Sequence, residues 1–421
     1  MPCRSAGART LRVHNVRHGG KHAAIFPSGI QLNSRPTPLK AYLLKTLANS
    51  GPMTFERFMA LCLYHPVHGY YMQRAERTGV AGDYFTSSDL HPVFARLVAR
   101  QAAEMWEILD RPSRFTWVEM GAGRGLFARD FLDWVKLRRP EFDRALEYAV
   151  VEPGPAVQAR LREKFAEAGL KDRIQIASTL EEVSPVTGCF FSNELADAFP
   201  VAVVTRFQGR LKEVYVQAEG EELVERLGPI SNSAVAGAVA RYAHETLEEG
   251  NRMEVSLAAM QWIRSVGEKL ARGFVITIDY GDLAERLYIP ERSEGTLMAY
   301  HRHVAGGSLL AAPGEQDLTA HVNFSALIDA GREEGLEETG FTTQERFLMA
   351  LGEENEFQDL CEPEAEVVSS LQARLQLKRL INPEGMGSLF NILIQHRGVS
   401  APRLMGLKYQ RRLRSETPLD S

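Results

Sequence analysis

A glycine-rich turn after a short apolar segment is the strongest chemical signal in the sequence. The segment 115–120, FTWVEM, predicts a buried strand, and Gly121, Gly123 and Gly125 follow it at alternate positions. Glycine permits a tight turn and lets a ligand approach the backbone closely. Apolar residues with helical spacing continue after the turn, so it joins a strand to a helix. This junction predicts a binding site for a nucleotide-like ligand.

The spacing of the glycines separates three classes of ligand. A phosphate-binding loop needs a Lys followed by Ser or Thr, and none follows here. A dinucleotide fingerprint needs a third glycine at position 126, which is Leu126. The spacing present, ExGxGxG from Glu119, resembles motif I of class I S-adenosyl-L-methionine (SAM) methyltransferases. SAM has no phosphate and needs no lysine, and Glu119 is placed to orient hydrogen bonds to its amino group.

A second carboxylate ends the next predicted strand. Glu152 follows the apolar segment 147–151. An acid at this place accepts two hydrogen bonds from ribose hydroxyls on wound α/β sheets. The two features together predict a SAM site. The alternative is a glycine turn that only packs a helix on the sheet, with Glu152 as a surface cap.

The end of the fourth predicted strand carries three polar residues. Asn193, Glu194 and Asp197 follow the apolar segment 188–191. Ligands of open wound sheets bind at the carboxyl ends of the strands, so these side chains are candidates for the methyl-acceptor site. Paired acids match a cationic acceptor such as guanidinium. The alternative is a helix start, with Asn193 as its N-cap and the acids facing the helix dipole.

The sequence does not contain the residue patterns of a metal site or of an α/β-hydrolase. His65 with His68, and His301 with His303, have no third ligand at a convincing spacing, so no metal is expected. No GxSxG elbow is present, which excludes an α/β-hydrolase.

The elements that position these residues alternate between strand and helix. This pattern predicts an α/β fold with a mostly parallel, Rossmann-like sheet, as in class I methyltransferases. The predicted organisation is a disordered leader at 1–35, a helical cap at 36–112, the methyltransferase domain at 113–398 and a basic tail at 399–421. Three strand-like segments with glycines between them predict a β-rich insertion at about 201–250. The region from 282 to about 323 is expected to be rich in loops, and a helix is expected at about 255–271.

Composition limits the partners and the compartment. The chain has 421 residues and a formal net charge of −5, so no global basic field indicates nucleic acid as a partner. Four widely spaced cysteines favour a reducing compartment over a disulfide framework. No segment reaches the length of about 18 apolar residues that a membrane span needs. The first acidic residue is Glu56, and the Arg-rich start before it resembles a transit peptide. The alternative is a bacterial extension, and we expect a cytoplasmic protein, or a mitochondrial matrix protein if 1–35 is a transit peptide.

Eight segments in one order extend the resemblance beyond methyltransferases in general. They are HPVHGYY (65–71), GDYFTSSDLHPVFARLVARQ (82–101), EMGAGRG (119–125), SNELADAFPV (192–201), ITIDYG (276–281), GTLMAYHRH (295–303), PGEQDLTAHVNF (313–324) and GMGSLFNILIQ (385–395). Together they resemble the MidA family of SAM-dependent methyltransferases over about 36–398, and its bacterial branch most. Mitochondrial members of that family dimethylate an arginine of a complex I core subunit. The resemblance implies that Gly82 and Asp83 lie over the cofactor. The segment after His303, VAGGSLLAA, departs from the family's charged segment.

The sequence therefore predicts methyl transfer from SAM to an arginine nitrogen of a protein, with a respiratory complex subunit as the partner that the resemblance implies. Two other functions stay open. One is an assembly chaperone that binds a partner with little or no methyl transfer. The other is a nucleotide-cofactor oxidoreductase, which Leu126 disfavours. The oligomeric state and the degree of methylation do not follow from the sequence.

Overall fold

The computed structural model describes residues 37–73, 91–243, 246–301, 304–358, 367–382 and 386–410, all within the unit Arg35–Ser421. Its central sheet has eight strands in the order β15-β16-β10-β5-β2-β3-β4, with β14 paired to β10. The strands are β2 (Phe115–Met120), β3 (Leu146–Val151), β4 (Ile174–Ala177), β5 (Val186–Asn193), β10 (Leu270–Asp282), β14 (Val322–Asn323), β15 (Glu337–Thr343) and β16 (Phe390–Arg397). The five strands from β10 to β4 are parallel, and β16 runs antiparallel to both of its neighbours. The predicted mostly parallel α/β sheet is confirmed.

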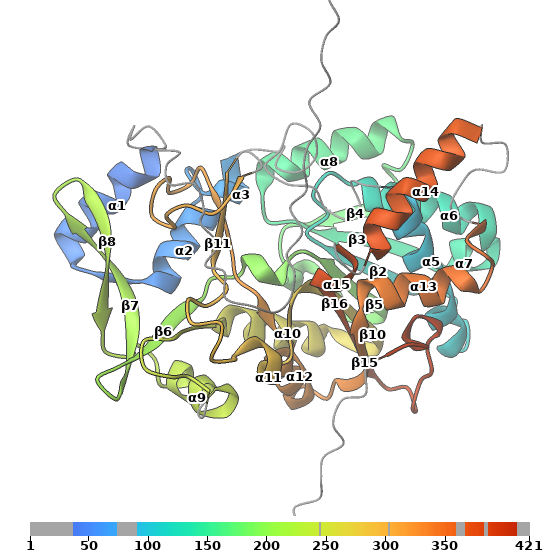
Figure 1. Cartoon of the computed structure of the whole chain (residues 1–421). Coiled ribbons are helices and arrows are strands. Elements are labelled where there is room, and N and C mark those ends of the chain that lie inside the picture. Colours follow the sequence, from blue (N-terminus) through green and yellow to red (C-terminus); the bar gives the residue numbers. More distant parts are fainter. Residues whose placement is uncertain are drawn as a thin grey trace, which may run out of the picture. The chain divides into compact units, whose positions relative to one another are not determined.

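The central strands are apolar on both faces, as buried parallel strands require. On β2, Trp117 packs into the core on one face and Val118 into the core on the other. The first face is covered by α5 (Val93–Ile108), α6 (Leu126–Arg138), α13 (Gln344–Glu353) and α14 (Val367–Ile381). The second face is covered by α10 (Leu257–Lys269) and α12 (Phe324–Glu333), as Figure 1 shows. Shorter or peripheral elements beside this sheet are the helices α7 (Pro140–Ala145), α8 (Pro155–Glu167), α11 (Ala284–Leu287) and α15 (Met386–Leu389) and the 3-10 turns η1 (Leu180–Glu182), η2 (Ala196–Ala198) and η4 (Met405–Leu407).

A second, antiparallel sheet contains the three strands predicted for the insertion. These are β6 (Ala202–Phe207), β7 (Arg210–Glu219) and β8 (Glu222–Gly228). The sheet gains β1 (Met53–Thr54) and β9 (Arg252–Val255), in the order β1-β7-β6-β9 with β8 on β7. The helices α1 (Pro38–Ser50) and α2 (Phe55–Tyr64) share a buried core with it, and Figure 1 shows them beside β7 and β8. The short α3 (Tyr70–Gln73) follows α2.

The helix expected at about 255–271 is confirmed as α10 (Leu257–Lys269), and the strand β9 precedes it. Two other features were not predicted. The loop-rich region 282–323 contains a small sheet of β11 (Met298–His301), β12 (Val304–Ala305) and β13 (Asp317–Thr319), whose strands are too short to show a period. The helix α9 (Ser233–Tyr242) lies within the insertion and was not predicted.

The domain boundaries stay a prediction, although two contacts bear on them. The early helices α1 and α2 pack on the insertion sheet, whereas α5 packs on α6 and the central sheet. The leader 1–35 and the tail beyond 410 lie outside the described residues. No helix among the described residues is long and apolar enough to cross a membrane.

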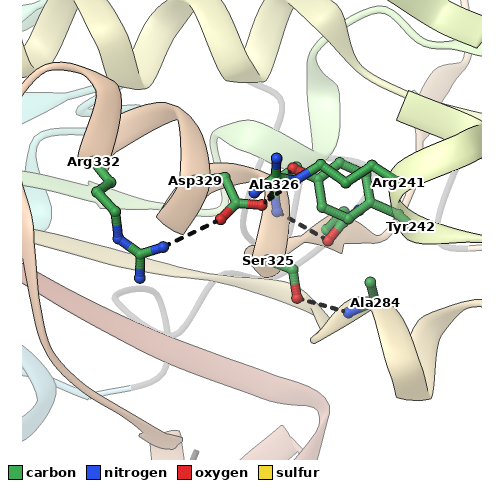
Figure 2. Close-up of polar contacts among 8 residues, drawn as sticks. Arg241, Tyr242, Ala284, Ser325, Ala326, Asp329 and Arg332 are labelled. Carbon is green, nitrogen blue, oxygen red and sulfur yellow. Dashed lines mark hydrogen bonds and ion pairs between the residues drawn. The ribbon is translucent and has the colours of Figure 1, made fainter. Parts of the chain in front are cut away.

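A polar cluster links the insertion to the central domain. Figure 2 shows Asp329 of α12 between Arg241 and Tyr242 of α9, with Arg332 on its other side. The Asp329 carboxylate accepts from the Arg241 guanidinium at 2.7 Å and from the Tyr242 hydroxyl at 2.8 Å. Arg241 is exposed, so the half-buried bond from Tyr242 is expected to contribute more to stability than the ion pair.

We expect Asp329→Asn to lower the free energy of unfolding in urea by about 1–2 kcal/mol, because it removes charge-assisted hydrogen bonds. Glu333→Gln is the matched control. Glu333 lies one turn after Asp329 on α12 and also pairs with an arginine, Arg264, but its side chain is exposed. That change is expected to cost under about 0.5 kcal/mol. Equal effects of the two substitutions would show that the Asp329 cluster is no more than a surface ion pair.

Candidate functional site

The glycine turn has the backbone shape that the sequence requires. Gly121, Gly123 and Gly125 have φ values of 76°, 50° and 73°, the left-handed region that side chains disfavour. The Gly121 N–H donates to the carbonyl of Val151 at 3.0 Å, which ties the turn to the end of β3. The Gly125 N–H donates to the Ala122 carbonyl at 2.8 Å and closes the turn before α6 begins.

The three glycines have different surroundings, which separates packing from binding. A Cβ at Gly125 would lie 2.9 Å from side-chain atoms of Leu161 and Phe165, so this glycine lets α8 pack on the turn. A Cβ at Gly121 would lie 3.1 Å from Leu195. A Cβ at Gly123 would meet no atom of the described residues within 4 Å, so among these three glycines only Gly123 faces open space in the described part of the chain. The packing alternative therefore accounts for Gly125 and not for Gly123.

Glu119 lies at the end of β2 and already has a protein partner. Its side chain is buried and accepts a hydrogen bond from the Tyr148 hydroxyl on β3 at 2.7 Å. Burial raises the pKa of Glu119 to about 7, and the bond from Tyr148 opposes that shift. The carboxylate is thus fixed at the end of β2, two residues before Gly121.

Glu152 is buried rather than a surface cap. Its side chain is 9% exposed, and its Oε1 accepts from the Gly154 N–H at 2.9 Å, at the start of α8. Burial raises the pKa of Glu152 to about 7. The Gly121 bond to Val151 brings the glycine turn to the strand end that carries Glu152. This arrangement supplies a carboxylate beside an open glycine turn, which fits the ribose of SAM.

The segment after β5 is not a helix start capped by Asn193. It forms the 3-10 turn Ala196–Ala198, which has no side-chain cap bond of its own. The Asn193 amide donates instead to the Glu194 carboxylate at 2.9 Å, and the Asn193 Oδ1 is buried without a hydrogen-bond partner. Glu194 has a φ of 54°, unusual for a residue with a side chain. The capping interpretation of these residues is therefore wrong.

Asp197 is buried among other acids. Its side chain is 7% exposed. Burial raises its pKa well above the usual value, and the charges of Asp279, Asp317 and Glu194 raise it further. Neither Asp197 nor Asp279 forms an ion pair with Lys or Arg among the described residues. This cluster of acids electrostatically favours the binding of a cation.

One carboxylate of this cluster, that of Asp317, comes from the small sheet. Asp317 of β13 is buried, and both of its oxygens accept from the Tyr71 hydroxyl, at 2.9 and 3.0 Å. The Tyr71 ring stacks on Tyr64 with centroids 5.6 Å apart. The Tyr64 hydroxyl donates to the carbonyl of Ala198 at 3.0 Å, next to Asp197. The cap thus supplies aromatic side chains to the acid-bearing turn.

Two further tyrosines face the same acids. Burial raises the pKa of Tyr280 and of Tyr300, and the charges of Glu194 and Asp197 raise both further. Asp317 adds to the effect on Tyr300. We call the set Glu194, Asp197, Asp317, Tyr64, Tyr71, Tyr280 and Tyr300 the acceptor pocket.

The sequence indicated part of this site. Parallel strands bring the segments after β2, β3 and β5 to one sheet edge, so Glu119, the glycines, Glu152 and Asn193 to Asp197 come together as expected. Sequence reasoning missed Asp279, Asp317 and the tyrosines, although ITIDYG and PGEQDLTAHVNF contain three of them. Gly82 and Asp83 lie outside the described residues. No group of three or more His, Cys, Asp or Glu in the described part of the chain is arranged to hold a metal.

Comparison with known proteins agrees with this geometry. Residues 97–342 match the model of the Methyltransf_28 family of SAM-dependent methyltransferases. A COG1565 superfamily member from Burkholderia thailandensis, solved with S-adenosyl-homocysteine bound, is 31% identical to this chain. The match covers 89% of this chain and 95% of that one, with a TM-score of 0.80.

Curated relatives are more distant in sequence and nearly as long. The human mitochondrial protein arginine methyltransferase NDUFAF7 is 25% identical over 429 residues, which is 94% of this chain and 91% of the human protein. The mitochondrial NDUFAF7 homolog of Drosophila melanogaster is 25% identical over 87% of this chain and 85% of its own length. The family model spans more than half of the chain, and the solved relative binds the demethylated form of SAM. The chain therefore belongs to the MidA family of class I SAM-dependent methyltransferases, and SAM is its cofactor.

Proposed function

We propose that this methyltransferase transfers the methyl group of SAM to an arginine nitrogen of a protein. The observation that carries the proposal is the acceptor pocket, in which buried acids and tyrosines lie beside the cofactor edge of the sheet. Carboxylates bind guanidinium through charge-assisted hydrogen bonds, and aromatic faces attract its positive charge. The names of the human and Drosophila relatives support the same acceptor.

The cofactor site is assigned to residues on three strand ends. Gly121 and Gly123 would lie beneath SAM, with Gly125 allowing the turn to pack on α8. Glu152 would accept hydrogen bonds from the ribose hydroxyls, and Glu119 would orient the amino group of the methionine part. Gly82 and Asp83 are proposed to cover the cofactor, as the resemblance implies.

The chemistry requires little more than positioning and a place for a proton. The sulfonium of SAM is intrinsically reactive, so in-line alignment of the nitrogen with the methyl carbon provides most of the acceleration. A guanidinium has a pKa above about 12, and its prior deprotonation at neutral pH is unfavourable. Glu194 and Asp197 would orient the guanidinium, and one of them would take the proton as the methyl arrives. Asn193 would hold Glu194 in place through the hydrogen bond that its side-chain amide donates to the Glu194 carboxylate.

A respiratory complex subunit is the acceptor that the resemblance implies. We propose a protein substrate of this kind, with no nucleic acid involved. A cytoplasmic protein remains our prediction, with the mitochondrial matrix as the alternative if 1–35 is a transit peptide.

Two other functions were considered from the sequence. A nucleotide-cofactor oxidoreductase is inconsistent with membership of a SAM-dependent family. An assembly chaperone that binds a partner without methyl transfer remains the competing proposal. The open space at Gly123 and the buried Glu152 support retained SAM binding, and so favour the enzyme.

Labelling with tritiated-methyl SAM tests the proposal. Purified protein is incubated with a lysate from a strain lacking its gene, and the labelled band is identified by mass spectrometry. We expect one or few labelled proteins, with the label in methylated arginine after acid hydrolysis. A partner that copurifies with the protein and gains no methyl group would favour the chaperone, and label on lysine would contradict the arginine assignment.

The pKa of Glu152 predicts a pH dependence of SAM binding. Below a pKa of about 7 this side chain is protonated and accepts ribose bonds less well. SAM affinity is therefore expected to rise about tenfold from pH 6 to pH 8 and then level off. Calorimetry of Glu152→Gln should show a weaker affinity and a smaller rise, because Glu119, whose pKa burial also raises to about 7, still titrates in the same site. Glu104→Gln, which alters another acid whose pKa burial raises, should keep the wild-type profile.

A further inference from the structure

Asp279 is the most heavily bonded carboxylate near the acceptor pocket, yet no step of the proposed reaction uses it. It lies near the end of β10, and its side chain is fully buried. One oxygen, Oδ2, accepts from three consecutive N–H groups, those of Leu195, Ala196 and Asp197, at 3.1, 2.7 and 3.3 Å. The other oxygen, Oδ1, accepts from the Tyr280 N–H at 2.8 Å.

Several bonds hold the turn that Asp279 binds. Glu194 has a φ of 54°, and its N–H donates to the Ile278 carbonyl at 3.0 Å. The Asp197 carbonyl accepts from the Ala320 N–H at 2.9 Å, and the Ala198 carbonyl accepts from the Tyr64 hydroxyl at 3.0 Å. The left-handed conformation is unfavourable for a residue with a side chain, so surrounding bonds must maintain this shape. The three N–H bonds to Asp279 add to this restraint from a single side chain.

We infer that Asp279 is the positioning residue of the acceptor site: its carboxylate fixes the Glu194 to Asp197 turn and keeps the proton on Asp197 until a cationic acceptor arrives. This inference rests on the proposed function, since it assumes that Asp197 contacts the acceptor. Asp279 itself lies behind the turn and acts through it.

The division of charge between the two acids follows from their hydrogen bonds. Both are buried and near each other, so burial and mutual repulsion disfavour two charges. Asp279 accepts four backbone N–H bonds, which stabilise its ionised form, whereas one such bond, from the Ala198 N–H, lowers the pKa of Asp197. The proton is therefore held by Asp197. The other titratable groups that face it are Glu194, Asp317, Tyr64, Tyr280 and Tyr300, and all of the acids among them favour the same outcome.

A guanidinium entering the pocket would reverse this preference. A nearby positive charge stabilises the ionised carboxylate, so Asp197 would release its proton to solvent as the acceptor binds. The ionised Asp197 could then accept the guanidinium proton when the nitrogen gains a methyl group. A neutral acceptor would not cause Asp197 to release its proton, so the site would select cationic acceptors.

The test compares Asp279→Asn, Asp279→Ala and Asp197→Asn by single-turnover labelling of the deletion-strain lysate with tritiated-methyl SAM, from pH 6 to pH 9. Glu213→Gln is the matched control, because Glu213 is also fully buried and accepts from the Ser231 N–H, at 2.7 Å, but belongs to the insertion sheet. Asp279→Asn removes the negative charge with little change of shape. Circular dichroism and SAM calorimetry establish that each variant is folded.

For Asp279→Asn we expect unchanged SAM affinity, a transfer rate about 10-fold or more below wild type, and a pH–rate midpoint lower by about one unit. The midpoint falls because Asp197 ionises more easily without a negative neighbour. Glu213→Gln should leave the midpoint unchanged even if it lowers stability. A folded Asp279→Asn with the wild-type rate and midpoint would overturn the inference. Should Asp279→Ala not fold, the Asn variant alone decides. Full activity of Asp197→Asn would refute the acceptor assignment itself, which is a separate outcome.

Discussion

Gly123→Val is expected to abolish SAM binding in calorimetry, with at least a 100-fold loss of affinity. A Cβ at this position meets no atom within 4 Å in the part of the chain that the structure describes, so the valine would occupy space that the cofactor needs. The fold should survive, because the new side chain displaces no neighbour. The left-handed φ of 50° costs stability on the order of 1–2 kcal/mol.

Gly169→Val separates this steric effect from backbone strain. Gly169 has a φ of 69° after α8, and a Cβ there also meets nothing within 4 Å, but it is away from the turn. The control should lose a similar amount of stability in urea and bind SAM like wild type. A folded Gly123→Val with unchanged SAM affinity would remove the cofactor from the glycine turn.

Asp197→Asn and Glu194→Gln are expected to lower methyl transfer by about 100-fold or more while SAM affinity stays within about twofold. The magnitude is that of acid–base and electrostatic contributions in enzymes. Burial and neighbouring acids raise the pKa of Asp197, so the folded protein favours its protonated form, which Asn resembles in shape and charge. The Asn variant should therefore fold well and fail in transfer.

Glu254→Gln is the control for this pair of variants. Glu254 is a buried acid of β9 whose pKa burial also raises, and it accepts from the Thr296 N–H and hydroxyl at 3.0 and 2.9 Å. Glu254→Gln should lower the free energy of unfolding more than it lowers the rate of methyl transfer. Full activity of both Asp197→Asn and Glu194→Gln in single-turnover labelling would leave the acceptor pocket without its catalytic acids.

The sheet and the cofactor edge could be predicted because their signals are local. Apolar segments mark the strands, and Gly121 to Gly125 mark the turn by spacing alone. Parallel topology then places Glu152 and Asn193 at the same edge. These steps need no contact between segments distant in the chain.

The acceptor pocket was only partly predictable, because several of its residues are brought together by contacts between distant segments. Asp317 reaches it through a three-residue strand that shows no period, and Tyr71 reaches it from the cap. Asp279, and not the Asn193 cap that was the alternative interpretation, binds the N–H groups of this turn, across 82 to 84 positions of sequence. Such pairings depend on tertiary packing, which neither propensity nor spacing records.

The central claim is that a cationic acceptor binds among the acids beside SAM, and a bisubstrate analogue tests it without knowledge of the acceptor protein. Two SAM analogues are made in which a short alkyl chain replaces the methyl group and ends in guanidine or in its neutral isostere, urea. By calorimetry we predict that wild type binds the guanidine compound at least about 100-fold more tightly than the urea compound, in line with the strength of buried charge pairs. We also predict that Asp197→Asn and Glu194→Gln each lose most of this preference. Equal affinity of wild type for the two compounds would contradict the account.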